Sequence, residues 1–245
     1  MVSRSELVRY LSDLLRLKEF SDFTSNGLQV EGCEEIHKVG FAVDACQETF
    51  ESLQDCQMIC VHHGIMWPSW DKITKVNRRR AKFLLEHDIN LFVSHLPLDA
   101  HPQLGNNAQI LKALGFEAQT KFGEVGWIFD FEESVDVTEL KEKIDKLFPH
   151  QILALWNGPK KIKRLGVCSG GGGVSFMHEA FENHVDLYIT GETTYSMYHD
   201  TKEYGLNMVC AGHYETETFG VKSLADHLKT QFDLETTFVD IPTGL

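Results

Sequence analysis

Short apolar runs alternate with amphipathic stretches along almost the whole chain, and this alternation limits the fold more than any other feature. Residues 57–61 are almost entirely apolar, whereas residues 136–148 carry apolar side chains at helical spacing. The predicted strands are 38–45, 57–61, 89–95, 125–131, 163–168, 185–192 and 206–213. The predicted helices are 5–17, 46–56, 77–88, 106–115, 136–148, 174–184, 196–205 and 215–232. This order predicts an α/β fold with mainly parallel sheets covered by helices.

We expect two closely packed α/β halves, residues 1–124 and 125–245. The expected boundary lies in the segment TKFGEVG at 120–126, where no low-complexity linker marks it. The final residues, 236–245, are predicted to form an extended tail.

The composition is that of a soluble globular protein, with 42% hydrophobic and 24% charged residues. No apolar stretch approaches the roughly 18 residues that span a membrane, and the amphipathic N-terminal helix does not resemble a signal peptide. The six cysteines form no CxxC pair, which is typical of reduced core thiols rather than of a zinc ribbon. We therefore expect a cytoplasmic protein with no membrane association.

The net charge limits the possible partners. A formal charge of -13 argues against binding along a nucleic acid backbone, because such binding needs a basic surface. The one notable basic run, NRRR at 77–80, is short and is better explained as the solvated face of a helix. Nucleic acid is therefore a disfavoured partner.

Polar side chains follow three predicted strands at the point where each strand ends. The three pairs are His62 with His63, His95 with Asp99, and His213 with Glu217. In open α/β sheets, functional sites gather beyond the carboxyl ends of the strands. Pro97 is expected to keep residues 95–99 in a loop, and the four-residue spacing of the last pair places both side chains on one face of a helix. All three pairs are therefore expected to face one rim.

Imidazole and carboxylate groups in this number point to a metal centre. Imidazole suits zinc, iron and manganese, and a carboxylate can bridge two cations. Five or six ligands exceed what one tetrahedral ion needs but suit two ions about 3.5–4 Å apart, and His62 and His63 could then bind different ions. A histidine beside a strand is more often structural, however, and the chain has twelve histidines. Spacing alone leaves both interpretations open.

Five blocks of the sequence, taken in order, resemble one known family. The blocks are NGLQVEG (26–32), HHG (62–64), SHLPLDAHPQLGNN (94–107), YITGE (188–192) and AGHYETETFGVKSLADHL (211–228). They are similar to the NGG-interacting-factor-like, or GTP cyclohydrolase I type 2-like, proteins, and in particular to the compact bacterial YbgI type. The resemblance covers nearly the whole chain.

The resemblance implies a dinuclear metal site and a toroidal homohexamer whose sites face an internal cavity. Carried over by position, the metal ligands are His62, His63, Asp99, His213 and Glu217, with Glu217 as the bridge. His95 matches a family histidine beside the site and would be a proton-transfer residue or a further ligand. One departure is Gly64, where many relatives have proline, and it puts the rigidity of this loop in doubt.

A glycine-rich segment at 168–176, CSGGGGVSF, follows a predicted strand and precedes a predicted helix. The backbone N–H groups of residues 170–173 could bind a phosphate at the helix start, but a tight turn explains the glycines equally well. Glu192 and His199 could line the same cleft as the metal ligands, and Asp44 has a similar position at a strand end.

Two functions from different classes follow. The first is a metal-dependent hydrolase in which two divalent ions activate a water molecule. By family resemblance its substrate is a nucleotide or related heterocycle, and the suggested reaction is that of GTP cyclohydrolase, hydrolytic opening of the guanine imidazole ring with loss of formate. The second is a non-catalytic metal-binding ring that acts as a scaffold or binds partner proteins. The metal could be zinc, iron or manganese, since the same ligands accept each of them.

Overall fold

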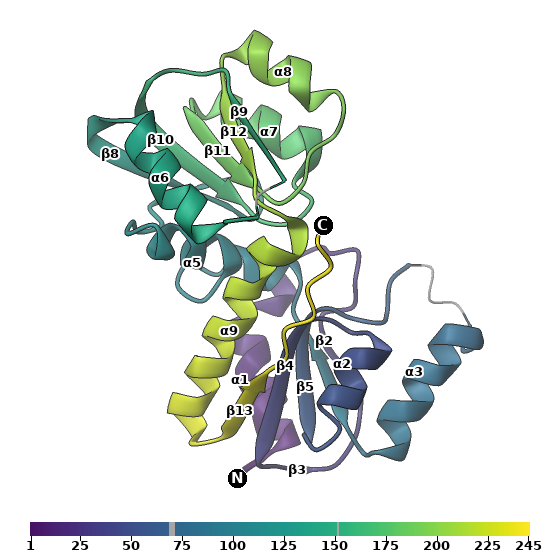
Figure 1. The fold of residues 1–245 in the computed structure, drawn as a ribbon. Coiled ribbons are helices and arrows are strands. Elements are labelled where there is room, and N and C mark those ends of the chain that lie inside the picture. Colours follow the sequence, from purple (N-terminus) through teal and green to yellow (C-terminus); the bar gives the residue numbers. More distant parts are fainter. Residues whose placement is uncertain (69–71, 151) are drawn as a thin grey trace. The chain divides into compact units, whose positions relative to one another are not determined.

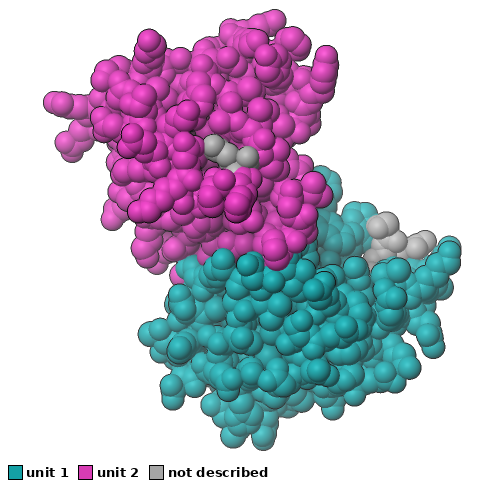
Figure 2. Space-filling model, in the orientation of Figure 1, with its two compact units in different colours: residues 1–98, 221–241 teal, residues 99–220, 242–245 magenta. Residues whose placement is uncertain are grey.

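The computed structural model describes residues 1–68, 72–150 and 152–245. The chain forms two compact units, which are coloured separately in Figure 2. Unit 1 consists of residues 1–98 and 221–241, and unit 2 consists of residues 99–220 and 242–245. The first boundary therefore lies after residue 98 and not after residue 124. Unit 1 also includes a segment near the C-terminus, residues 221–241.

Unit 1 is built around a five-stranded sheet in the order β13-β4-β5-β6-β2 (Figure 1). Its strands are β2 (Gly27–Val30), β4 (Lys38–Asp44), β5 (Met58–His63), β6 (Asn90–Val93) and β13 (Glu235–Phe238). Neighbours from β13 to β6 are parallel, and β2 runs antiparallel to β6. The predicted extended tail is thus wrong at its start, because Thr236–Phe238 belong to β13 and lie opposite Val39–Phe41 of β4.

Helices cover both faces of this sheet. They are α1 (Arg4–Leu14), α2 (Gln47–Ser52), α3 (Lys75–Glu86) and the part of α9 (His213–Phe232) that follows Gly220. Figure 1 shows α2 and α3 on one face and α1 and α9 on the other. Phe50 of α2 and Leu84 of α3 pack with Ile59 and Leu91 of the sheet in one apolar core. On the opposite face, Tyr10 of α1 contacts α9.

Three short elements complete unit 1 near the N-terminus. They are the paired strands β1 (Val2–Ser3) and β3 (Glu35–Ile36) and the single turn η1 (Leu17–Glu19). The side chain of Ser3 accepts a hydrogen bond from the backbone N–H of Glu6 and so caps α1.

Unit 2 contains a six-stranded mixed sheet in the order β7-β8-β10-β11-β12-β9. Its strands are β7 (Thr120–Phe122), β8 (Gly126–Asp136), β9 (Leu153–Trp156), β10 (Lys161–Cys168), β11 (Leu187–Thr190) and β12 (Asn207–Cys210). The central strands β10, β11 and β12 are parallel, whereas the pairings toward both edges are antiparallel. The expected parallel arrangement therefore describes the centre of this sheet and not its edges.

The helices of unit 2 pack on both faces of its sheet (Figure 1). They are α5 (Asn106–Ala113), α6 (Val137–Leu147), α7 (Gly173–Glu182) and α8 (Met197–Tyr204). Ile110 of α5 and Ile144 of α6 pack against Leu165 and Ile189 in one apolar core of the unit. None of the helices in the described ranges is long and apolar enough to cross a membrane.

One short helix corrects a prediction. Pro97 predicts a loop over residues 95–99, but Leu96–Ala100 form the helix α4 with Pro97 as its second residue. Proline is tolerated there because the first backbone N–H groups of a helix have no partner within the helix.

The parallel strands bring their carboxyl ends together within each unit. In unit 1 this edge holds the histidines that end β5 and follow β6. In unit 2 it holds the residues that follow β10, β11 and β12, which include Ser169, Glu192 and His213. Both edges are the kind of place where functional sites gather.

Candidate metal-binding residues

Unit 1 brings three histidines together. The ligand nitrogens of His62, His63 and His95 all lie within 4.8 Å of one another. Their ring centroids are 4.8 to 5.5 Å apart. His62 is completely buried, and the other two rings are partly exposed. Three imidazoles at this spacing are a donor set that suits zinc, iron or manganese.

Each of these rings is oriented by an oxygen atom. The Nδ1 atom of His62 donates a hydrogen bond to the Ser94 carbonyl at 2.9 Å. The Nδ1 atom of His63 donates to Asp44 Oδ1, and that of His95 donates to Asp22 Oδ1, both at 2.8 Å. Because carbonyl and ionised carboxylate oxygens only accept, the ring proton lies on Nδ1 and the lone pair lies on Nε2. Histidines that bind metal through Nε2 are usually held in this way.

Asp22 holds His95 especially firmly. Burial alone would raise the pKa of Asp22, but hydrogen bonds from His95 and Asn26 lower it to about 2. Its Oδ2 atom also accepts from the Leu96 backbone at 3.1 Å, and Asn26 accepts from the His95 backbone at 2.8 Å. The ionised, buried side chain of Asp22 therefore fixes the His95 ring and the Leu96 backbone, while Asn26 fixes the His95 backbone.

Gln29 holds the loop that follows the histidine doublet in place. Gln29 Oε1 accepts hydrogen bonds from the backbone N–H groups of Ile65 at 2.8 Å and Met66 at 3.1 Å. A Cβ atom at Gly64 would lie 2.6 Å from the Gln29 amide and from a methyl group of Val93. Glycine at this position lets Gln29 approach, and its amide then anchors the loop.

Unit 2 places one histidine between two carboxylates. His213 is the first residue of α9, and its Nε2 lies 3.1 Å from Oε1 of Glu217 one turn later. Its Nδ1 lies 2.6 Å from Oε1 of Glu192, which follows β11. Burial alone would lower the pKa of His213, but Glu217 and Glu192 raise it to about 9. A metal ligand must be a neutral imidazole, so metal binding at Nε2 would release a proton.

Asp99 is the second buried carboxylate of unit 2. Its Oδ1 accepts from Asn106 Nδ2 at 2.8 Å and from Ser169 Oγ at 2.9 Å. Asn106 in turn accepts from the Gly220 backbone at 2.6 Å, and Asn107 accepts from the Ser169 backbone at 2.6 Å. Two side-chain donors therefore hold Oδ1 of Asp99 in a fixed position.

The glycine-rich segment passes directly against these carboxylates. Gly170 has a φ of 63°, and a Cβ atom there would lie 2.1 Å from Oε1 of Glu217. Its N–H donates to Thr216 Oγ1 at 2.9 Å, and its carbonyl accepts from Glu192 N at 3.1 Å. At Gly172, a Cβ atom would lie 2.7 Å from the Tyr188 hydroxyl. Close packing therefore accounts for Gly170 and Gly172 without a phosphate.

Sequence reasoning found the candidate ligands but missed several of their partners. Asp44 and Glu192, which lie at the ends of predicted strands, both contact the Nδ1 atom of a site histidine. Asp22, Asn106 and Ser169 were missed. The polar turn SDFTSN around Asp22 is a signal that could have been noticed, because aspartate and asparagine commonly bond to nearby backbone in turns.

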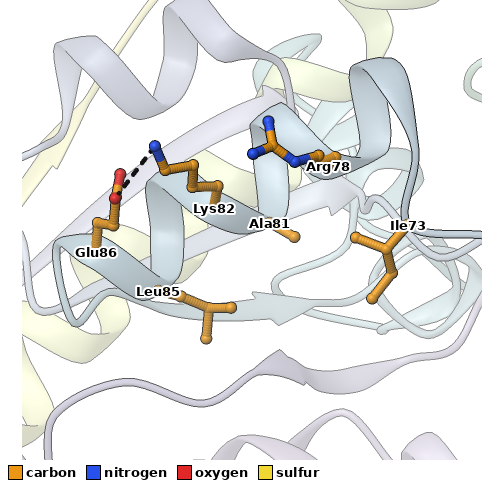
Figure 3. Close-up of a pocket in the computed structure, with 6 residues that line it drawn as sticks. All are labelled: Ile73, Arg78, Ala81, Lys82, Leu85 and Glu86. Carbon is orange, nitrogen blue, oxygen red and sulfur yellow. Dashed lines mark ion pairs between the residues drawn. The ribbon is translucent and has the colours of Figure 1, made fainter.

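The basic run at 77–80 lies on α3, as expected. A shallow hollow of about 340 Å³ lies over this helix and is lined by Ile73, Arg78, Ala81, Lys82, Leu85 and Glu86 (Figure 3). Arg78 and Arg79 are exposed, and Lys82 pairs with Glu86 at 3.3 Å. This hollow contains none of the predicted metal ligands.

Comparison with known proteins gives a consistent result. The family model described as Duf34/NIF3 (NGG1p interacting factor 3) matches residues 2–244. A protein of Archaeoglobus fulgidus named GTP cyclohydrolase 1 type 2 homolog is 40% identical over 248 residues, which cover 98% of this chain and 99% of the relative. A protein of Pyrococcus horikoshii with the same name is 40% identical over 252 residues and matches over the full length of both chains.

Solved structures agree with these relatives. The protein ybgI, described as of unknown function, superposes with a TM-score of 0.93 at 35% identity, and the match covers 100% of both chains. A protein of Thermus thermophilus gives a TM-score of 0.91 at 38% identity, again over 100% of both chains. The family model, the sequence blocks and the fold agree, and the chain therefore belongs to the Duf34/NIF3 family.

Proposed function

We propose that this protein binds two divalent metal ions and acts as a metal-dependent hydrolase on a nucleotide or related heterocycle. By family resemblance, His62, His63, Asp99, His213 and Glu217 would hold the ions. The observation that carries the proposal is the orientation of the histidines. In both units the Nδ1 atom of each site histidine meets an oxygen acceptor, which leaves Nε2 as the ligand atom.

The buried carboxylates support the same conclusion. Asp99 is 5% exposed and Glu217 is 3% exposed. A charged group removed from water costs free energy unless it is paired, and a divalent cation is the strongest partner available to a carboxylate. The residues of each unit therefore fit the metal that the family resemblance implies.

Bound divalent ions would lower the pKa of a water molecule toward about 7 and polarise the group that it attacks. The protein's own contribution is proton transfer by His95. Because ionised Asp22 holds Nδ1–H, His95 can accept a proton at Nε2, and the carboxylate stabilises the resulting imidazolium. His95 is thus our candidate catalytic residue.

The substrate class is supported by relatives that carry the name GTP cyclohydrolase 1 type 2 homolog. The reaction we propose first is therefore hydrolytic opening of the guanine imidazole ring with loss of formate. We also propose a toroidal homohexamer, to be checked by light scattering, and a cytoplasmic location. The six free cysteines support that location, because thiols persist in a reducing compartment.

The test combines metal analysis with an activity screen. Protein purified without added metal should contain about two metal ions per chain, and the as-isolated protein should release formate from GTP. His63→Ala and Glu217→Gln should lose metal and activity, whereas His37→Ala, which removes an exposed histidine, should keep both. Metal content near zero that cannot be restored would overturn the proposal.

The screen also separates the two functions that the sequence left open. Full metal content without hydrolysis of GTP, other nucleotides or phosphoesters would favour the non-catalytic ring that binds partner proteins. Cells in which the Glu217→Gln variant still performs the function of the wild-type protein would also favour the non-catalytic ring.

A further inference from the structure

Three aromatic side chains gather at the surface of unit 2, just beyond Glu192. Tyr195 is 89% exposed and Tyr198 is 42% exposed. His199 is also exposed and meets both rings edge to face, with centroid distances of 6.3 Å to Tyr195 and 5.3 Å to Tyr198. Single exposed apolar side chains are ordinary, but several aromatic rings in contact at a surface indicate a binding site.

The loop that carries Tyr195 is anchored at both ends. At its start, the Glu192 backbone donates to the Gly170 carbonyl at 3.1 Å. At its end, Met197 is completely buried and donates its backbone N–H to the Thr194 carbonyl at 3.2 Å. Thr194 also bonds to Ser196 through its hydroxyl at 3.1 Å. An exposed ring on an anchored loop binds a ligand with little loss of conformational freedom.

The helix side of the cluster is ordered as well. The Lys202 ammonium group lies 4.3 Å from the centroid of the Tyr198 ring and 2.9 Å from its hydroxyl. These contacts hold Tyr198 through a cation–π interaction and a hydrogen bond. Tyr198 then supports the edge of His199.

This cluster is close to the proposed site along the chain. Glu192 contacts His213, and the three residues from Glu192 to Tyr195 span at most about 11 Å. Tyr195 and the Glu192 partner of His213 therefore belong to the same short segment of unit 2.

We propose that Tyr195 and His199 form a stacking platform for the planar heterocycle of the substrate. This inference rests on the proposed hydrolase function and names the group that binds the base. Aromatic side chains suit this role because every base has a π-face and stacks on them without a specific hydrogen-bond pattern. The platform selects for a ring and contributes nothing to binding of a phosphate chain alone.

Equilibrium binding of three probes tests the platform. The probes are GTP, guanosine and inorganic tripolyphosphate, each titrated into the as-isolated protein. Tyr195→Ala should weaken GTP and guanosine about tenfold, the effect of losing one base–aromatic stack, and leave tripolyphosphate unchanged. Tyr195→Phe should retain the affinity for GTP. The control is Phe181→Ala, which removes an exposed aromatic residue of α7 outside the cluster and should change none of the three.

Three outcomes would overturn the inference. The first is an affinity for GTP that Tyr195→Ala leaves unchanged, and the second is a loss of affinity for tripolyphosphate equal to that for GTP. The third is a smaller molecular mass of Tyr195→Ala in light scattering, which would assign the cluster to a contact between subunits. Metal content separates this inference from the proposed function. If Tyr195→Ala binds GTP as tightly as wild type while the protein holds its metal, only the stacking platform is refuted. If the wild-type protein holds no metal, the hydrolase proposal itself is overturned.

Discussion

Each proposed histidine ligand is oriented by a second group that accepts its Nδ1–H. Asp44 is the clearest case, because its side chain at the end of β4 accepts the Nδ1–H of His63 at 2.8 Å. A site in which the orienting groups come from separate strands and turns is sensitive to small substitutions around it. The residue scale therefore offers the sharpest tests of the metal proposal.

Asp44→Ala is expected to weaken metal binding about 10- to 100-fold, the usual effect of removing a group that orients a ligating histidine. The fold should persist because Asp44 is partly exposed. Competition with a chromophoric chelator measures the affinity, and Glu48→Ala, which removes an exposed carboxylate of α2, serves as the control. Equal affinities for Asp44→Ala and wild type would show that His63 needs no such support.

Gly170→Ala and Gly173→Ala form a matched pair. Both glycines have a φ close to 60°, but a Cβ atom at Gly173 meets nothing within 4 Å, whereas one at Gly170 lies 2.1 Å from Glu217 Oε1. Gly173→Ala should cost about 1–2 kcal/mol from backbone strain alone. Gly170→Ala should cost more and should also lower the metal content, because Glu217 must move. Denaturant unfolding and metal analysis measure the two effects, and equal results for both variants would contradict the steric argument.

At the scale of helices and strands, long periodic segments were predictable and short edge elements were not. The buried central strands and the helices α1, α3, α5 and α6 follow from apolar spacing alone. Strands β7, β9 and β13 have three or four residues each, and their pairing depends on neighbours that are distant in sequence. Helix α4 does not follow from the sequence pattern, because a proline signals the end of a helix unless it lies in the first turn, as Pro97 does.

The candidate site shows the same limit. Its histidines and carboxylates could be identified because their residue types stand out at strand ends. Their partners could not, since Asp22 lies 73 residues from His95 and Ser169 lies 70 residues from Asp99. Aspartate, serine and asparagine are common in turns, so only the folded chain shows which of them meet a ligand.

Helix α5 provides a prediction at this scale. Its first residue, Asn106, is completely buried and joins Asp99 to the Gly220 backbone of α9. Asn106→Ala should lower the free energy of unfolding by about 2–4 kcal/mol, because it removes two buried hydrogen bonds and leaves the Gly220 N–H without this acceptor. Urea unfolding measures the change. Asn183→Ala, which removes one hydrogen bond to Glu179 in a partly exposed position, should cost less than half as much, and a similar loss for both would refute the argument.

The whole molecule carries a formal charge of -13, and two of the acidic residues behind this excess are buried proposed ligands. Glu217 is nearly inaccessible to solvent in unit 2 and faces His213, and Asp99 is buried in the same unit. Binding of divalent cations would reduce the electrostatic cost of folding at these positions. The stability of the folded chain should therefore depend on metal.

Removal of metal with a chelator is expected to lower the Tm by about 5–10 °C. A ligand present at 100 times its Kd stabilises the folded state by about 2.7 kcal/mol, and each kcal/mol shifts the Tm of a chain of this size by about 2–4 °C. Differential scanning calorimetry before and after chelation, with metal then restored, measures the effect. The control is the His63→Ala, Glu217→Gln double variant, which should show no response to either treatment because it lacks one proposed ligand in each unit. A wild-type Tm that is indifferent to chelation, or an equal shift in the double variant, would mean that metal at these residues does not stabilise the fold.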